Sequence, residues 1–472
     1  MSNHIHIRLW VSWGAILLFV LLPALTLRAQ TPRPAADYNP FGVVEGFWLP
    51  EVVCDLHPGW ERIIFDWSQH QPTGAEDWNT LNVDERWLVA AQDCGREIVA
   101  IIKHTPAWAT DGTPGPGVPR GLYLPVDDPD NTWAAFIRRT VEYYRWRGVN
   151  RFIIWNEPDI SSDTYGFEFE GSLEDYFQMV KVAYLAGKPE NPDLKIHLAG
   201  TTYWHDINAG RRLYLDRLLE RIVADPDAAD NDYYFDTVSL HIYFRTHTVY
   251  DIVRETRMLL DAYGLTDKTI WINETNAGPT DDPLWPVVRP VYQLDLAQQA
   301  AFLIQSAALG LAGGAERIAV YKFFDWSLPP GGETFGLLRA DESRRPAFDT
   351  WGMVIRELSG VVKTSLAQTN TLAVVRLDYA DGRTGILAWA QTATPTSIQV
   401  TTNETGAVLF DQYGHGETII SQNGHYTLSL PGAICNSVDG CPVGGVVSLL
   451  SLSGGGITVQ EITSGSVDLT FE

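Results

Sequence analysis

Two glutamates follow apolar segments, at places where a carboxylate has little structural reason to lie. Glu157 comes just after the run Phe152–Trp155, and Glu274 comes just after Thr269–Asn273. Two carboxyl groups that face one pocket can cleave a glycosidic bond, because one protonates the leaving oxygen while the other attacks the sugar or activates water. The pair predicts this chemistry, provided that the fold brings the two segments together.

Short apolar runs alternate with longer amphipathic segments from Phe41 to about Ser359. The runs are rich in Val, Ile, Phe and Tyr and mostly lack alternating polar residues, which is typical of strands buried on both faces. The eight predicted strands are Gly42–Phe47, Arg62–Asp66, Ile98–Lys103, Phe152–Trp155, Lys195–Ala199, Thr237–Tyr243, Thr269–Asn273 and Ile318–Phe324. Helices are expected between them, for example at Thr132–Trp146, Leu173–Ala186, Arg211–Val223, Val249–Tyr263 and Leu296–Leu311.

Eight strands that alternate with helices predict an α/β fold, a (β/α)8 TIM barrel over residues 41–359. An open, doubly wound sheet is the alternative, but no Gly-rich phosphate loop follows the first predicted strand. Active sites of barrels lie at the C-terminal ends of the strands, so Glu157 and Glu274, after strands four and seven, would reach one mouth.

The pattern changes after Gly360, where strand-length runs follow one another without helices. These runs are Leu372–Tyr379, Gly385–Gln391, Ser397–Thr402, Ala407–Asp411, Glu417–Ser421, Tyr426–Leu430 and Val446–Leu452. Turn signals such as Asp381-Gly382 and Asn423-Gly424 separate them, which predicts a C-terminal antiparallel β-sandwich over residues 360–472. No Pro/Ser/Thr-rich linker precedes the first run, so we expect the sandwich to pack on the barrel.

The N-terminus has the pattern of a targeting segment. Leu9–Leu27 is an almost unbroken apolar run that ends before Arg28-Ala29. We interpret residues 1–29 as a secretion signal, with an uncleaved membrane anchor through residues 9–27 as the alternative; either places the rest outside the cytoplasm. Residues 30–40, with three prolines, are predicted to form a linker.

Four cysteines fit an oxidising compartment. Cys435 and Cys441 lie six residues apart in a loop-like segment, which predicts a local disulfide, and Cys54 with Cys94 could form a second one. Neither spacing resembles a CxxC metal site, and buried free thiols are the alternative to the disulfides.

The charge balance limits the kinds of partner. With 34 Lys+Arg against 58 Asp+Glu, the net charge is −24, which argues against a nucleic acid or an anionic membrane surface as partner. A membrane contact is expected only if the N-terminal segment is an uncleaved anchor. The chain also has 17 Trp, and because aromatic rings offer flat platforms for sugars, a carbohydrate partner is favoured.

Six segments, in order along the chain, match one known pattern. They are Arg62–Trp67 with Gln71-Pro72, Lys103–Trp108, Trp155-Asn156-Glu157-Pro158, His241–Tyr243, Glu274, and Tyr321–Trp326. Together they resemble the retaining (β/α)8 glycoside hydrolases of clan A over about residues 41–358. Within the clan, the resemblance is nearest to the β-xylosidase and α-L-iduronidase family and to cellulase-like relatives.

The resemblance implies roles for the reacting groups. Glu157 would be the general acid/base and Glu274 the nucleophile, and Asn156 would hydrogen-bond the 2-hydroxyl of the sugar. Arg62 and Tyr243 would bracket Glu274, because a nearby cation keeps a nucleophilic carboxylate ionised. The expected activity is therefore retaining cleavage of O-glycosidic bonds by a secreted enzyme.

The resemblance also implies which residues contact the sugar. Trp326 would form the floor beneath it, and His104, Trp108 and His241 would line the rim. The chain departs from the clan's usual form at Asn273, where a small residue commonly precedes the nucleophile. No cofactor and no metal is implied.

Several alternatives stay open at this point. His241 could be a satisfied core histidine, and a His/Asp metal site could occupy the barrel mouth, although no His-x-His follows the first strand. The chain could also be a non-catalytic carbohydrate-binding or scaffold protein on a barrel fold. Glu45 and Asp66 lie near strand ends, and their roles are not assigned.

Overall fold

The structure is a computed structural model that describes residues 39–164, 166–287, 292–326, 334–463 and 466–471. The segment interpreted as a signal or anchor (residues 1–29) and most of the linker (residues 30–40) lie outside these ranges. Within them, no helix has the length and hydropathy that a transmembrane span requires.

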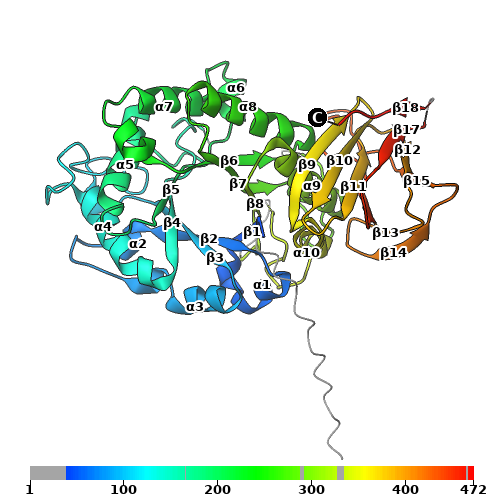
Figure 1. Cartoon of the computed structure of the whole chain (residues 1–472). Helices are drawn as coiled ribbons and strands as arrows, with labels where there is room; N and C mark the ends of the chain where they lie inside the picture. The colour runs from blue at the N-terminus through cyan, green and yellow to red at the C-terminus, as the bar shows by residue number, and fades with distance from the viewer. Residues whose placement is uncertain (1–38, 165, 288–291, 327–333, 464–465, 472) are drawn as a thin grey trace, which may run out of the picture. The chain divides into compact units, whose positions relative to one another are not determined.

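Eight parallel strands form a closed barrel in which each strand pairs with the next along the chain and β8 pairs with β1 (Figure 1). The strands are β1 (Phe41–Val44), β2 (Trp60–Asp66), β3 (Glu97–Lys103), β4 (Val149–Ile154), β5 (Lys195–Leu198), β6 (Thr237–Tyr243), β7 (Thr269–Asn276) and β8 (Arg317–Val320). The predicted TIM barrel is thus confirmed.

Helices connect successive strands, and in Figure 1 those labelled α3, α4, α5, α7 and α8 lie outside the ring of strands. The helices are α1 (Pro50–Leu56), α2 (Trp67–His70), α3 (Glu85–Asp93), α4 (Thr132–Tyr144), α5 (Leu173–Gly187), α6 (Trp204–Asn208), α7 (Tyr214–Val223), α8 (Val249–Ala262), α9 (Leu296–Gly313) and α10 (Pro346–Leu358). Short 3₁₀ turns are η1 (Gly46–Trp48), η2 (Thr80–Asn82), η3 (Ala107–Ala109), η4 (Arg145–Arg147), η5 (Ala229–Tyr234) and η6 (Thr246–Thr248). The five helices predicted from the sequence correspond to α4, α5, α7, α8 and α9.

Alternation along the strands decides which side chains enter the barrel. In β2, Trp60 and Ile64 belong to the cluster of apolar side chains inside the barrel, and Arg62 lies between them with the same orientation. In β3, Ile101 belongs to that cluster, and Lys103 follows it two residues later. The period of two therefore carries both cations toward the C-terminal mouth of the barrel.

The C-terminal ends of three strands differ from the prediction by more than one residue. β1 stops at Val44, because Glu45 has a left-handed backbone (φ 61°) and η1 begins at the next residue. β8 stops at Val320 instead of Phe324. β7 extends to Asn276, so that Glu274 lies inside a strand rather than after it.

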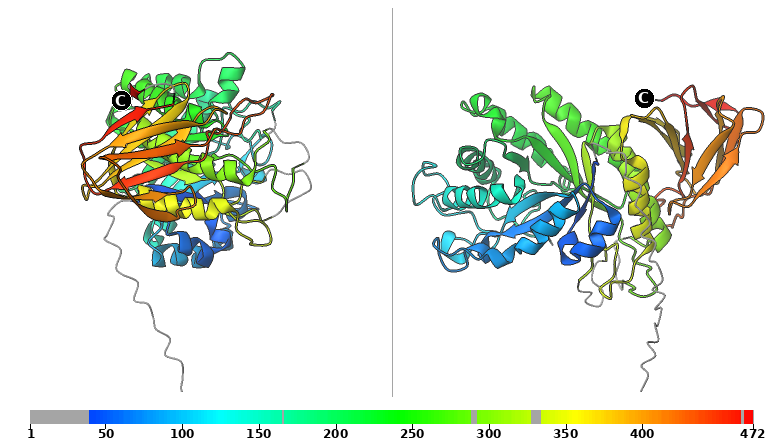
Figure 2. Two further views of the ribbon diagram at one scale, coloured as in Figure 1. Left: turned by 90° about the vertical axis from the view of Figure 1, so that its right-hand side faces the viewer. Right: turned by 60° about the horizontal axis from the view of Figure 1, so that its bottom comes forward.

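The C-terminal region forms two antiparallel sheets, as predicted for a sandwich (Figure 2). One has the order β14-β13-β16-β11-β10-β9 and the other β15-β12-β17-β18. Their strands are β9 (Val361–Gln368), β10 (Leu372–Tyr379), β11 (Thr384–Ala390), β12 (Thr396–Thr401), β13 (Gly406–Phe410), β14 (Gly416–Ile420), β15 (His425–Leu430), β16 (Ser448–Leu452), β17 (Thr458–Glu461) and β18 (Val467–Asp468). The sequence missed β9, in which only Leu366 and Ala367 are buried, and the short β17 and β18.

The sandwich is joined to the barrel by specific contacts. The Gln305 amide of α9 donates to the carbonyl of Gly445 at 2.8 Å, and the backbone N–H of Thr246, just after β6, donates to the carbonyl of Pro442 at 3.1 Å. Trp389 of β11 belongs to the same hydrophobic cluster as the outer layer of the barrel. The loop that follows β6 is therefore anchored on the sandwich.

Both predicted disulfides are present. Cys54 of α1 is bonded to Cys94, just after α3, and Cys435 is bonded to Cys441. Disulfides persist in oxidising environments, so both bonds are typical of a protein outside the cytoplasm.

Candidate active site

A change of register in β7 places Glu274 in the barrel mouth. Trp271 points into the barrel interior, so simple alternation would send Asn273 the same way and Glu274 outward. The pairing with β6 shifts by one residue after Ile272, and His241 is paired with Glu274. Such a bulge re-aims the side chain that follows it. As a result Glu274, rather than Asn273, lines the central cavity.

Glu157 reaches the same cavity from the turn after β4. Its φ is 40° and that of Trp155 is 71°, both in the left-handed region that non-glycine residues seldom adopt. The backbone N–H of Glu157 donates to the carbonyl of Gly200 at 3.1 Å, which fixes the turn against the end of β5. Strained backbone of this kind is concentrated at functional sites.

Glu274 is buried and held by two donors. A terminal nitrogen of Arg62 (Nη2) lies 2.5 Å from Oε1, and the Tyr243 hydroxyl donates to Oε2. Burial alone would raise the pKa of Glu274, but the charges of Arg62 and His241 and the hydrogen bonds from Tyr243 and Arg62 outweigh it. The pKa of Glu274 therefore lies below its ordinary value. Burial, followed by the charge of Glu274, raises the pKa of Tyr243 far above its usual range, so its hydroxyl remains a donor.

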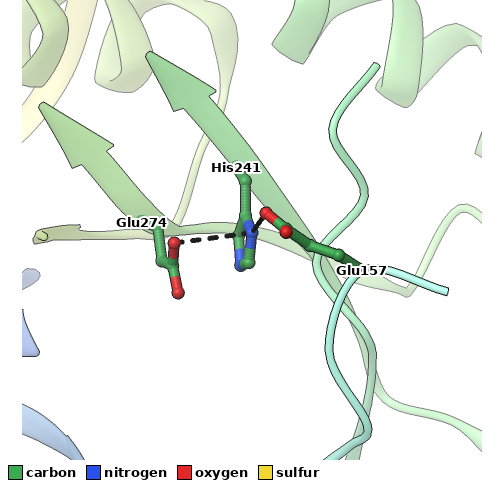
Figure 3. A group of neighbouring side chains, drawn as sticks. All are labelled: Glu157, His241 and Glu274. Atoms are coloured by element: carbon green, nitrogen blue, oxygen red, sulfur yellow. Dashed lines mark hydrogen bonds and ion pairs between the residues drawn. The ribbon is translucent and has the colours of Figure 1, made fainter. Parts of the chain in front are cut away.

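His241 lies between the two glutamates, as Figure 3 shows. Its Nδ1 is 2.6 Å from Oε1 of Glu157 and 3.5 Å from Oε2 of Glu274. Burial lowers the pKa of His241, but the charge of Glu274 and the contact with Glu157 outweigh burial and raise it. His241 is therefore part of the site rather than a satisfied core histidine, and its Nε2 is buried without a hydrogen-bond partner among the described residues.

The backbone of Gly200 provides the space for this imidazole. A Cβ atom at position 200 would lie 2.1 Å from Nε2 of His241. No side chain fits there unless His241 moves, so Gly200 fixes where the histidine can lie.

Glu157, His241 and Glu274 are also spaced like metal ligands, since one donor atom from each lies within 4.8 Å of the others. The environment does not fit a divalent cation well. Arg62 already neutralises Glu274 from 2.5 Å, and its fixed positive charge would repel a metal ion beside it. His241 Nδ1 is engaged by Glu157. The arrangement suits two carboxyl groups in different electrostatic environments better than a metal centre.

The two glutamates line a cavity of about 340 Å³, which is within the range of small-ligand sites. Arg62, Asn156 and Tyr243 line it too, and Oδ1 of Asn156 is buried without a hydrogen-bond partner among the described residues. That acceptor is available to a bound hydroxyl group.

Two ion pairs made by glutamates of the cavity wall, Glu168 and Glu45, were not recognised from the sequence. Lys103 Nζ lies 2.6 Å from Glu168, and Lys322 Nζ lies 3.3 Å from Glu45. Alternation in β3 indicates the direction of Lys103, but Glu168 lies in the loop after β4, where no pattern identifies it. Glu45, whose role was unassigned, lines the cavity wall.

The residues expected at the rim and floor lie outside that wall. Nδ1 of His104 contacts Asp66 at 2.8 Å, and the indole N–H of Trp108 donates to the carbonyl of Gln71 at 2.6 Å. Neither His104 nor Trp108 is among the residues that line the cavity. Asp66 thus supports His104 rather than the two glutamates.

Trp326 does not form the floor of the cavity that the described residues enclose. Its side chain is 62% exposed, and its ring centroid lies 6.2 Å from that of Trp48. Trp326 follows the end of β8 at Val320 and is not among the residues that line the cavity. The apolar side chains Ile64 and Ile101 of β2 and β3 line the cavity instead.

No protein-family model and no curated protein matches the chain. Its fold does match solved structures of glycoside hydrolases. A family 39 glycoside hydrolase from the gut symbiont Bacteroides cellulosilyticus WH2 matches with a TM-score of 0.64 and 16% identity, covering 88% of this chain and 80% of that one. A monomeric β-xylosidase from Caulobacter crescentus CB15 matches with a TM-score of 0.56 and 14% identity, covering 89% and 95%.

A family 30 endoxylanase from Clostridium papyrosolvens C71 matches with a TM-score of 0.57 and 12% identity, covering 88% of this chain and 96% of that one. At such identities the likeness establishes the fold and leaves the chemistry to be argued from the site. The chain has the barrel fold of glycoside hydrolases of families 30 and 39, as its resemblance to clan A indicates.

Proposed function

We propose that this chain is a glycoside hydrolase that cleaves O-glycosidic bonds with retention of configuration. The observation that carries the proposal is the unequal environment of two carboxyl groups at one cavity. Glu274 is held ionised by Arg62 and Tyr243, whereas the carboxyl group of Glu157 has His241 as its one hydrogen-bonding side chain among the described residues. When two carboxyl groups have different environments, one can act as the nucleophile and the other as the acid/base.

In the first step, a carboxylate oxygen of Glu274 attacks the anomeric carbon while Glu157 donates its proton to the departing oxygen. A covalent bond joins the sugar to Glu274, and the leaving group departs as an alcohol. In the second step, Glu157 removes a proton from water as the water oxygen attacks the same carbon. Glu274 leaves as a carboxylate, and Glu157 is protonated again.

The separation of the two groups supports this sequence. A carboxylate oxygen of Glu157 lies within 4.8 Å of one from Glu274. Retaining enzymes place their carboxyl groups about 5–5.5 Å apart, whereas inverting enzymes need about 6.5–9.5 Å to admit a water molecule. The short separation favours direct attack by Glu274.

Other side chains position these groups and the sugar. Arg62 and Tyr243 orient Glu274, and His241 holds Glu157 from β6. Asn156, with its unpaired Oδ1, would contact the 2-hydroxyl of the sugar. Lys103 and Lys322 are both paired with carboxylates, so a neutral sugar suits the central cavity better than an acidic one.

We also propose that residues 1–29 direct the chain out of the cytoplasm, as a cleaved signal or as an anchor. The two disulfides support this localisation. The catalytic domain would comprise residues 41–359 and the sandwich domain residues 360–472.

A panel of aryl glycosides, beginning with β-xylosides because of the likeness to a β-xylosidase, tests the activity. The wild type should release the aryl alcohol from at least one sugar, and Glu274→Ala should release none. Sugar binding without turnover on any aryl glycoside or polysaccharide would instead indicate the non-catalytic carbohydrate-binding alternative.

A further inference from the structure

A second cavity lies on the other side of Glu157. It has a volume of about 210 Å³ and shares Glu157, Tyr243 and Phe244 with the central cavity, whereas His241 lines only the second cavity and Glu274 only the central one. If the proposed function holds, the sugar under attack must touch both glutamates, whereas the departing group needs only the acid Glu157. The second cavity therefore lies where the leaving group would be bound.

The side chain of Arg245 is fixed in the wall of this cavity. Arg245 comes two residues after the end of β6, and its Nε donates to the hydroxyl of Tyr292 at 2.9 Å. The guanidinium carbon lies 5.1 Å from the ring centroid of Trp204 and 5.8 Å from that of Tyr292. Contacts with two aromatic faces restrain a guanidinium without consuming its terminal N–H groups.

The charge of Arg245 is not balanced locally. Within the ranges that the structure describes, no carboxylate lies within 4.0 Å of it, and neither Nη1 nor Nη2 has a hydrogen-bond partner. By contrast, Arg62 and Lys103, which line the central cavity, each contact a glutamate, and Lys322 contacts Glu45 of the cavity wall. This is unusual in a chain with 58 acidic and 34 basic residues.

We propose that the second cavity binds a leaving group that carries a carboxylate, such as a uronic acid unit, and that Arg245 is the residue that selects it. The terminal nitrogens of a guanidinium match the two oxygens of a carboxylate in parallel hydrogen bonds. The Trp204 ring offers an apolar face to the rest of the group. The substrate would then join a neutral sugar in the central cavity to an acidic unit in the second.

The chemistry of Glu157 is compatible with this selection. In the proposed mechanism, Glu157 carries the proton that it donates until the glycosidic bond breaks, so it does not oppose an acidic leaving group. After the proton has been transferred, the ionised Glu157 repels the released carboxylate, which favours its departure. An acidic leaving group is thus bound before cleavage and expelled after it.

Binding measured by calorimetry tests the proposal without requiring turnover. Methyl β-D-glucuronide and methyl β-D-glucoside differ only in a carboxylate against a hydroxymethyl group. The wild type should bind the glucuronide about tenfold more tightly, as expected for hydrogen bonds to a charged group, and less so at high salt. Arg245→Gln should remove this preference, and Arg245→Lys should retain part of it.

Arg139→Gln is the matched control. Arg139 of α4 also lies over a tryptophan, 4.5 Å from the ring centroid of Trp78, and it bonds to the carbonyls of Ala75 and Asp77. It lines neither cavity, so its loss should leave the preference for glucuronide intact. Equal affinities in the wild type, no binding of either probe, or a preference that survives Arg245→Gln would each overturn the proposal.

A turnover measurement separates this inference from the proposed function. With the sugar that is active in the aryl panel, the 4-carboxyphenyl glycoside is compared with its methyl ester. Arg245→Gln should lower the ratio of kcat/KM for the acid to kcat/KM for the ester about tenfold. The intrinsic leaving ability of each aryl group is the same for the wild type and the variant, so it cancels when their ratios are compared. Binding selectivity without any turnover would refute the hydrolase but not the acidic site, whereas turnover without selectivity would refute only the acidic site.

Discussion

Arg62 and Glu274 form an ion pair, with Nη2 2.5 Å from Oε1 and both side chains buried. The two residues come from β2 and β7, strands that are not adjacent in the barrel. A buried carboxylate is costly unless it is paired, and the Arg62 cation lowers the pKa of Glu274 below its ordinary value. The pair thus supplies an ionised nucleophile inside an apolar barrel.

Replacement of Arg62 by methionine should shift the pH dependence of kcat/KM. Attack requires ionised Glu274, so the wild type keeps its activity as the pH falls until the lowered pKa of Glu274 is reached. Loss of the cation raises that pKa, and the acid limb of the pH profile should move to higher pH. An unchanged acid limb in Arg62→Met would contradict the role of the pair.

The same substitution should cost about 3–5 kcal/mol in the free energy of unfolding, because it leaves an unpaired buried charge. Since the pKa of Glu274 is lowered in the folded state, the pair stabilises the fold above the unfolded-state pKa of glutamate. This contribution is lost as the pH falls through the lowered value. Arg62→Met with Glu274→Gln removes both charges and should recover much of the loss at neutral pH.

Glu157→Ala should act differently from Glu274→Ala. General acid catalysis contributes about 10²–10⁴-fold, so Glu157→Ala should lose that much on substrates with poor leaving groups and less on activated aryl glycosides. Azide should partly restore its turnover by attacking the covalent intermediate. Failure of azide to produce any glycosyl azide would argue against Glu157 as the acid/base.

Gly200→Ala should displace His241, because the new Cβ would lie 2.1 Å from Nε2. We expect a loss of about 1–3 kcal/mol in the free energy of unfolding from overpacking, together with lower kcat. Gly74→Ala is a suitable control, since a Cβ at position 74 meets no atom within 4 Å. Equal melting temperatures and rates for the two variants would show that His241 tolerates the methyl group.

Chelators should leave the activity unchanged. Although Glu157, His241 and Glu274 have the spacing of metal ligands, Arg62 occupies the position beside Glu274 that would favour a cation. Turnover rates measured before and after dialysis against EDTA should agree. A loss restored by added Zn²⁺ or Mn²⁺ would identify these three residues as a metal site instead.

The barrel could be predicted because its strands are buried on both faces, so each is a short apolar run in the sequence. The ends of the strands are less predictable, since they depend on tertiary contacts. β1 ends at Val44 because Glu45 has a left-handed backbone, and β7 continues past Glu274 through its pairing with β6. Neither of these strand ends can be recognised from the local sequence.

The central residues of the site could be inferred, but the contacts farther out could not. Glu157 and Glu274 stand out as carboxylates next to apolar runs, and the resemblance to clan A implies Arg62. The resemblance implies Trp326 as the floor, yet its ring lies beside that of Trp48 and it does not line the central cavity. Arg245 and Tyr292 meet across loops that are distant in sequence, and only the fold reveals their contact.

The most direct test of the central claim is the configuration of the first product, followed by proton NMR during hydrolysis. The separation of the Glu157 and Glu274 oxygens, within 4.8 Å, predicts a covalent intermediate on Glu274. The sugar released first should therefore have the same anomeric configuration as the substrate, and the other anomer should appear only later through mutarotation. Initial release of the opposite anomer would contradict the double-displacement mechanism.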